Sequence, residues 1–425
     1  MIPTLVISFV ILLLISVPIS ITLAIVTAIA LYFHASVPLL VIPQQLFNAL
    51  DNFVMLAVPF FILAGAIMTE GSIARRLINV MNLFVGRIRG GGAVTSVIAC
   101  MFFAALSGSS PATVVAIGSV MIPALAKSGY DEKFSLGLLT SAGSLGIVIP
   151  PSIPMIFYCL VMNVSVAELF MAGILPGFLI GGLFIGYTIY MSRKHNWKDT
   201  KVYTLKEGFK IIKEGIWGLL LPVIVLGGIY SGIFTPTEAA AISVVYALFV
   251  EVVIHRGMTF AKLKKALVES AVLSACLLFI LSCAMTFIWL LTAEQIPMRV
   301  AEFTVGFAKN WWLFLLLVNI LFLIMGSVMD DVSAMIILSP IFFETLRRFN
   351  IDLVHYGIVM VLVIEFGFLT PPFGLNLFVT MGITKKNLVE VSRAVLPFLV
   401  LLLIALFFIS YIPAISLYLP TKFLR

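Results

Sequence analysis

The architecture follows from two stretches of sequence, Gly143-Ser144-Leu145-Gly146-Ile147-Val148-Ile149-Pro150-Pro151 and Glu365-Phe366-Gly367-Phe368-Leu369-Thr370-Pro371-Pro372. Each stretch places two consecutive prolines inside a long apolar segment. Proline has no backbone N–H and its ring clashes with the preceding turn, so each pair interrupts a helix and frees carbonyl oxygens there. We therefore expect two broken helices, over residues 134–160 and 353–383.

The composition places these breaks in a membrane. Of the 425 residues, 62% are hydrophobic and 11% are charged, and the mean hydropathy is +1.19. Soluble domains carry about 25% charged residues, so the soluble classes are excluded, nucleic-acid binders among them. The net charge of +7 fits basic loops that orient membrane helices better than a nucleic-acid site. The four cysteines lie in apolar stretches and indicate no disulfide framework.

Other apolar segments approach the roughly 20 residues that a membrane helix needs. Besides the two broken helices, the candidates are residues 52–68, 169–191, 216–234, 236–254, 270–293 and 394–419. Residues 2–33 fit either two thin crossings or one broken helix.

Two further segments, 93–126 and 310–343, are long but interrupted by small polar residues. The interruptions are Ser107-Gly108-Ser109-Ser110-Pro111 in the first and Gly326-Ser327 with Asp330-Asp331 in the second. Irregular backbone is tolerated at membrane depth only where protein or water surrounds it. We therefore expect both segments to be re-entrant hairpins, which enter and leave on the same side.

An internal repeat relates the two halves of the chain. Phe61–Ile67 resembles Phe279–Met285 at an offset of 218 residues. Prolines 18, 123 and 150–151 recur as 236, 340 and 371–372, at offsets of 218, 217 and 221. The prediction is an all-α polytopic membrane protein with two inverted repeats, each with a re-entrant helical hairpin and a Pro-Pro-broken helix. Its units are residues 1–191 (hairpin 93–126, broken helix 134–160) and 216–425 (hairpin 310–343, broken helix 353–383), joined by a basic linker, 192–215.

Positive charge predicts the orientation, since Lys and Arg collect in cytoplasmic loops. Five crossings and one hairpin per repeat invert the second repeat relative to the first. Twenty of the 26 Lys and Arg residues then lie in cytoplasmic loops, seven of them in linker 192–215, and six lie outside. Both chain ends are expected outside, and no Lys or Arg remains within the membrane.

Freed carbonyls together with hydroxyls are suitable ligands for a small hard cation. The first hairpin tip, Ser107–Ser110, is expected beside the first break, and Gly326 and Ser327 beside the second. We favour one cation site per repeat over the alternative that the prolines are kinks that only pack. Asp330 and Asp331 fit either a helix cap or a cation ligand.

An anionic solute would meet no basic side chain in the membrane. Its charge would have to be balanced by bound cations and by the N-termini of half-helices, whose N–H groups attract anions. Such half-helices begin at Pro111 and after Ser327. The candidate substrate-binding residues are Ser110, Pro111, Thr113, Asp330 and Asn376.

Glu238 illustrates the choice between structural and functional roles for an acid within the membrane. It lies in Thr235-Pro236-Thr237-Glu238-Ala239, where it can stabilise the first turn of a helix, and we favour that role over a proton relay. The sequence contains no GxxxxGK[ST] or HExxH motif and no nucleophile–base pair. A non-transporting membrane scaffold or a membrane-embedded enzyme nevertheless stands as the alternative to a transporter.

Four motifs resemble one known family. They are Leu106-Ser107-Gly108-Ser109-Ser110-Pro111-Ala112-Thr113, Ile149-Pro150-Pro151-Ser152, Phe234-Thr235-Pro236-Thr237-Glu238-Ala239-Ala240-Ala241 and Thr370-Pro371-Pro372-Phe373-Gly374-Leu375-Asn376-Leu377. These motifs resemble those of the large membrane subunit (M, or DctM type) of tripartite ATP-independent periplasmic (TRAP) transporters. The resemblance extends over essentially the whole chain.

The resemblance implies a sodium-driven elevator in the bacterial inner membrane that imports an organic acid, of the C4-dicarboxylate or sialic acid type. It also implies two partners, a separate small four-helix membrane subunit and a periplasmic substrate-binding protein. By the same similarity, co-transported sodium ions would occupy two sites. The first would use Ser107, Ser109, Gly146, Ile149 and Pro151, and the second Gly326, Ser327, Gly367, Thr370 and Pro372.

Overall fold

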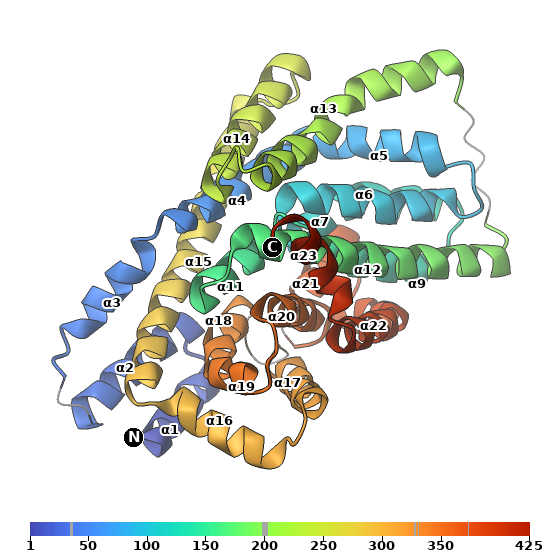
Figure 1. The fold of residues 1–425 in the computed structure, drawn as a ribbon. Coiled ribbons are helices and arrows are strands. Elements are labelled where there is room, and N and C mark those ends of the chain that lie inside the picture. The colour runs from blue at the N-terminus through green and yellow to red at the C-terminus, as the bar shows by residue number, and fades with distance from the viewer. Residues whose placement is uncertain (35–36, 198–202, 327–328, 330, 373) are drawn as a thin grey trace.

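The computed structural model describes residues 1–425 apart from 35–36, 198–202, 327–328, 330 and 373. Every regular element in those described ranges is a helix (Figure 1). The first part of the chain forms α1 (Ile2–Leu14), α2 (Ile19–His34), α3 (Val41–Leu50), η1 (Phe53–Leu56), α4 (Ala57–Glu70), α5 (Ile73–Val85), α6 (Gly91–Ser107), α7 (Ser110–Thr113), η2 (Val114–Gly118), α8 (Ser119–Lys127), α9 (Glu132–Ala142), α10 (Leu145–Val148), α11 (Ile153–Met162) and α12 (Val166–Lys194).

The second part of the chain is also helical where it is described. It forms α13 (Leu205–Tyr230), α14 (Pro236–Phe249), η3 (Val250–Ile254), α15 (Phe260–Ala293), α16 (Ile296–Phe307), α17 (Trp311–Gly326), α18 (Asp331–Ile341), α19 (Phe343–Arg348), α20 (Leu353–Leu369), α21 (Leu375–Thr384), α22 (Leu388–Tyr411) and α23 (Ala414–Phe423).

Eight helical segments of the described chain are long and apolar enough to cross a membrane. The number is nine if α16 and α17, which meet at an angle of 117°, are taken as one span. The prediction of an all-α polytopic membrane protein is confirmed.

Both proline pairs interrupt helices at the expected places. The first lies between α10 and α11 and the second between α20 and α21. Ile149 and Thr370, which directly follow α10 and α20, are both extended, with ψ of 125° and 137°. A residue before proline is disfavoured in the α-helical region, so the break begins one residue ahead of each proline pair.

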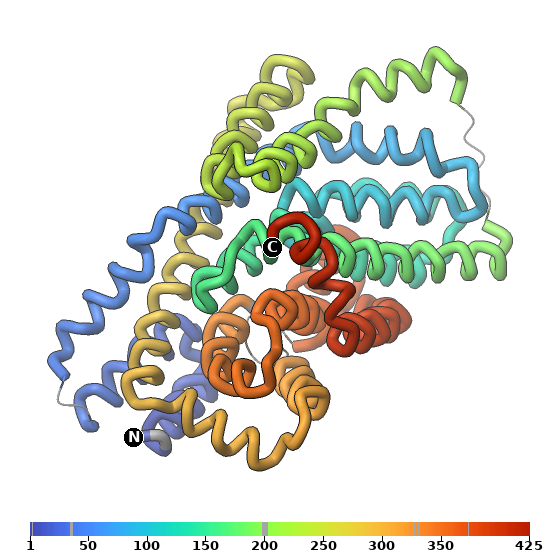
Figure 2. Tube along the Cα trace, in the orientation of Figure 1, coloured from blue at the N-terminus to red at the C-terminus, as the bar shows by residue number. Residues whose placement is uncertain are grey.

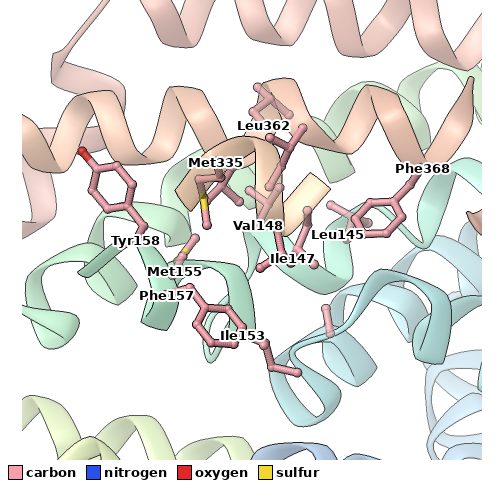
Figure 3. Close-up of a cluster of buried hydrophobic side chains, with 14 of the residues drawn as sticks. Leu145, Ile147, Val148, Ile153, Met155, Phe157, Tyr158, Met335, Leu362 and Phe368 are labelled. Atoms are coloured by element: carbon pink, nitrogen blue, oxygen red, sulfur yellow. The ribbon is translucent and has the colours of Figure 1, made fainter. Parts of the chain in front are cut away.

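The core between the two breaks is apolar and closely packed. Side chains of α10 and α11 interlock with those of α18 and α20, as Figure 3 shows for Leu145, Val148, Met335 and Leu362. These four side chains are buried. This packing places the first break against elements that come from the far end of the sequence.

Of the two alternatives left open for residues 2–33, the structure has two separate helices. It departs from the predicted segments in three places. A helix that was not predicted, α3, covers residues 41–50. The expected span 394–419 is wrong: the chain breaks at Ile412 because Pro413 follows it, and α23 begins at Ala414. Most of the predicted linker is helical, since α12 continues to Lys194 and α13 begins at Leu205.

One amphipathic helix, α5, leads into the segment predicted as the first hairpin. It lies beside α6 and α13 (Figures 1 and 2), and Ile73, Leu77 and Val80 on its apolar face are buried. A methyl group at Gly215 of α13 would lie 2.2 Å from the Val80 side chain, so the glycine allows this close approach.

Candidate functional site

The first break is an enclosed stretch of irregular backbone. Pro150, Pro151 and Ser152 are all buried. Helix α11 restarts with Ser152 as its N-cap, since the Ser152 Oγ accepts a hydrogen bond from the Met155 N–H at 3.4 Å. The buried break is therefore open to contact from other parts of the protein but not from bulk solvent.

The tip between α6 and α7 lies directly on this break. Helix α6 ends at Gly108, whose φ of +60° suits a residue without a side chain. The Ile153 N–H donates to the Gly108 carbonyl at 3.2 Å. A methyl group at Gly108 would lie 2.9 Å from the Pro151 carbonyl oxygen, so the two irregular segments touch through their backbones.

Three oxygens meet where the tip approaches the break. The Thr113 Oγ1 donates to the Ser109 carbonyl at 2.9 Å, and the Ser107 Oγ lies 3.1 Å from the Thr113 Oγ1 and 3.3 Å from that carbonyl. A methyl group at Gly146 would lie 2.5 Å from the Ser109 oxygen and 2.7 Å from the Thr113 oxygen. Ser107 and Thr113 are buried. We call Ser107, Ser109, Thr113 and Gly146 the first oxygen cluster.

The structure thus brings together most of the residues expected at the first cation site. Ser107, Ser109 and Gly146 meet directly, and Pro151 joins them through its contact with Gly108. The Ile149 side chain packs toward α12, where a methyl group at Gly177 would lie 2.4 Å from it, so a role of Ile149 in the site would rest on its backbone carbonyl. Thr113, which was expected as a substrate contact, is also part of the first oxygen cluster. Closely spaced neutral oxygens of this kind suit a hard cation.

The second break is organised differently. The Thr370 Oγ1 donates to the Phe366 carbonyl at 2.8 Å, and the Gly374 N–H donates to the Thr370 carbonyl at 3.0 Å. Pro371 and Pro372 are exposed. Gly326 ends α17 and is buried, and α17 packs against α20, which carries Gly367. Ser327 and Asp330 lie outside the described residues.

The remaining substrate candidates occupy two different environments. Pro111 lines a cavity of about 1050 Å³. None of the described residues that line this cavity is charged, and most are apolar. Its walls come from the α1–α2 junction, the α6–α7 tip, α11, α15, α18, α20 and α21.

Ser110 and Asn376 contact each other through hydrogen bonds that also involve Glu365. The Asn376 Nδ2 donates to the Ser110 Oγ at 2.7 Å, and the Ser110 Oγ donates to the Glu365 Oε1 at 3.0 Å. All three residues are fully buried. Glu365 was assigned no role from the sequence, although an acid in a long apolar segment signals a functional candidate.

Two other glutamates in apolar helices have structural roles. Thr235 and Glu238 form a reciprocal capping box at the start of α14, so the predicted capping role of Glu238 is confirmed. Glu251, which the sequence did not single out, accepts from the N–H groups of Ser72 and Ile73 at 2.6 and 2.7 Å and so caps α5. Burial and the Arg76 guanidinium lower the pKa of the adjacent His255.

Paired breaks in membrane helices around a polar centre are typical of secondary transporters. The comparisons identify the family: residues 6–415 match the model of the "Tripartite ATP-independent periplasmic transporter, DctM component". The chain therefore belongs to the DctM family of TRAP transporters, as its motifs predicted. These are transporter subunits and not enzymes.

Two relatives and one solved structure illustrate the similarity. The chain is 47% identical over 376 residues to the C4-dicarboxylate TRAP transporter large permease protein DctM of Pseudomonas aeruginosa, with 88% of each chain covered. It is 39% identical to the isethionate TRAP transporter permease protein DctMQ of Oleidesulfovibrio alaskensis, covering 96% of this chain and 65% of that protein. The YdaH transporter of Alcanivorax borkumensis shares the fold, with a TM-score of 0.63, 16% identity, and coverage of 96% of this chain and 98% of that one.

Proposed function

We propose that this chain is the large permease subunit of a sodium-coupled transporter that imports an organic acid delivered by a binding protein. The observation that carries the proposal is the first oxygen cluster, where the Ser107 and Thr113 hydroxyls lie within 3.3 Å of the Ser109 carbonyl. These are neutral oxygens at a helix break, which is the ligand set that a sodium ion prefers.

Electrostatics supports the coupling of sodium to an acid. An ionised carboxylate is costly to move out of water unless its charge is compensated. The described lining of the 1050 Å³ cavity contains no Lys, Arg or His, while Ser109, which also belongs to the first oxygen cluster, lies on its wall. A sodium ion in that cluster would place a positive charge beside the cavity. Cation and acid would then stabilise each other.

The relatives suggest the class of solute. One is named for C4-dicarboxylates and another for isethionate, which is a sulfonic acid. The shared feature of these solutes is a small molecule with an acidic group. We extend that class to this chain.

The same proposal includes the partners, the location and the movement. In the relative named DctMQ, which is longer than this chain, the name combines two subunit letters, in keeping with a separate small four-helix subunit here. A periplasmic binding protein would deliver the solute to the inner membrane, with segment 192–215 on the cytoplasmic side as its seven basic residues indicate. The two hairpins and broken helices would move together as an elevator against the rest of the chain.

The test is uptake into proteoliposomes that contain this chain with its small subunit and binding protein. Uptake of a labelled dicarboxylate or sulfonate is expected to require an inward sodium gradient and to collapse when a sodium ionophore is added. Uptake that continues at the same rate with potassium in place of sodium would overturn the proposal. A control with an inward proton gradient and no sodium separates sodium coupling from proton coupling.

A further inference from the structure

A buried polar cluster connects the two helix breaks. It consists of Ser110 from α7, Glu365 from α20 and Asn376 from α21, which we call the linking cluster. The Ser110 Oγ donates to the Glu365 Oε1 at 3.0 Å, and the Asn376 Nδ2 lies 2.7 Å from the Ser110 Oγ and 3.4 Å from the Glu365 Oε1. The three side chains are fully buried.

In the sequence, the residues of the linking cluster lie close to candidate ligands of both cation sites. Ser110 follows Ser109, whose carbonyl belongs to the first oxygen cluster, while Glu365 precedes Gly367, a candidate ligand of the second cation site, by two residues. Ser110 and Glu365 are 255 residues apart in sequence. One hydrogen bond therefore joins the backbone segment that forms the first site to the helix that carries the second.

Breaking the hydrogen bonds of the linking cluster is costly, so they resist movement of α7 relative to α20. In a medium of low dielectric constant, hydrogen bonds are strong, and a buried polar group that loses its partner carries the full cost of desolvation. If α7 shifted against α20, the bonds at the Glu365 Oε1 would break together. A cation that pulls Ser109 and Ser110 into one position thus also restrains α20, and by linkage the effect is reciprocal.

We propose that Glu365 is a positioning residue that couples the two cation sites, so that binding of one sodium ion favours binding of the other. This inference rests on the proposed sodium-coupled function. The bonds at Oε1 are accepted by a carboxyl oxygen, and the amide oxygen of glutamine accepts the same bonds. The role therefore requires an acceptor at this point, and Gln is expected to replace Glu.

A neighbouring bond offers a matched control. The Thr140 Oγ1 lies 2.8 Å from the Thr380 Oγ1, both residues are fully buried, and the contact joins α9 to α21. Like the linking cluster, it connects the two halves of the sequence. Unlike that cluster, it does not involve a residue adjacent to a candidate cation ligand.

The experiment measures initial uptake against sodium concentration in the reconstituted three-component transporter. For two coupled sites the Hill coefficient has a ceiling of about 2. The Hill coefficient of the wild-type transporter is expected to approach that ceiling. Glu365→Ala is expected to reduce the coefficient to about 1 and to raise the sodium concentration for half-maximal uptake about tenfold. Glu365→Gln is expected to restore the coefficient, and Thr380→Val to leave it unchanged.

Ser110→Ala provides a second way to cut the link with a smaller change of volume, in case Glu365→Ala does not fold. It is expected to lower the Hill coefficient as well. Wild-type cooperativity in a folded Glu365→Ala or Ser110→Ala variant would overturn the inference, as would an equal loss in Thr380→Val. A wild-type Hill coefficient of about 1 with intact sodium dependence would refute the coupling alone. Sodium-independent uptake by wild type would instead refute the proposed function.

Discussion

The two Pro-Pro breaks have the same local chemistry and different surroundings. Each begins with an extended residue, Ile149 in the first and Thr370 in the second. Pro150 and Pro151 are buried beneath the α6–α7 tip, whereas Pro371 and Pro372 are exposed. The tip that lies on the first break gathers the Ser107 and Thr113 hydroxyls around the Ser109 carbonyl, but the Thr370 hydroxyl at the second break is bonded to the Phe366 carbonyl of its own helix.

This difference separates two requirements of a cation site. Consecutive prolines are sufficient to open a helix and free carbonyl oxygens. They are not sufficient to gather ligands from several directions, which needs a second segment of chain against the break. At the first break that segment is the α6–α7 tip. The predictions below test whether the first break is the better organised of the two.

The largest effect is expected from Gly146→Ala at the first break. The added methyl group would lie 2.5 Å from the Ser109 carbonyl oxygen and 2.7 Å from the Thr113 Oγ1, closer than real contacts allow. We expect sodium-dependent uptake to fall at least about tenfold, because a displaced ligand costs roughly 1.4 kcal/mol or more. Uptake is measured per amount of folded protein. Gly382→Ala, whose methyl group would have no neighbour within 4 Å, is the control; wild-type sodium dependence in Gly146→Ala would contradict the assignment.

A smaller effect is expected from removing single hydroxyls at the two breaks. Ser107→Ala removes an oxygen of the first cluster, so the sodium concentration for half-maximal uptake should rise about tenfold. Thr370→Ala removes a hydroxyl that already donates to the Phe366 carbonyl, so the rise should be about two- to threefold. Sodium titrations of uptake compare the two variants. A larger effect of Thr370→Ala would reverse the ranking of the two breaks.

A third prediction concerns the ends of the helices that flank the breaks. Arg425 pairs with Glu168 of α12 at 3.0 Å and with Asp352, the N-cap of α20, at 2.6 Å. Burial opposes ionisation of Asp352, but hydrogen bonds from Arg425 and the α20 backbone lower its pKa. Arg425→Gln should therefore lower the melting temperature, by an amount equivalent to about 0.5–1 kcal/mol for these partly exposed pairs.

The pH dependence of that effect has a definite sign. A carboxyl group whose pKa is lowered in the folded state contributes stability above its unfolded pKa and loses it as the pH falls through the folded pKa. The difference in melting temperature between Arg425→Gln and wild type should stay constant between about pH 7 and 5 and shrink below about pH 4. A difference that grows on acidification would show that the ion pairs do not cause it.

The smallest effect on uptake and stability is expected at Glu238, which caps α14 and has no assigned role at either break. Glu238→Gln keeps a side chain that can cap α14, so the melting temperature should change little and sodium-coupled uptake should keep its wild-type pH profile. The measurement is uptake between about pH 6 and 8 together with a thermal melt. A selective loss of uptake at one end of that pH range would contradict the capping role and support the alternative that Glu238 is part of a proton relay.

The sequence predicted features that depend on neighbouring residues. The breaks at 149–152 and 370–374 follow from proline stereochemistry, and the capping box of Thr235 and Glu238 from residue types three positions apart. The break at Ile412 followed from the same rule at Pro413 but was missed, because hydropathy alone joined α22 and α23 into one span. The short helix α3 was missed because it lacks the length of a crossing.

Features that join distant parts of the chain were harder to predict. The capping of α5 by Glu251 connects residues 178 and 179 positions apart, and the bond between Ser110 and Glu365 connects residues 255 apart. A carboxylate in an apolar segment signals that a partner exists. It does not indicate which helix supplies that partner, since many donors along the chain are equally compatible with the pattern.

The sequence by itself determined a membrane location and the positions of the two breaks, because apolar length and proline geometry act on neighbouring residues. The tertiary structure alone decided which break is enclosed and which polar side chains meet. Hydrogen bonds act over about 3 Å, and the partners are brought within that distance only when helices from both halves of the chain pack together.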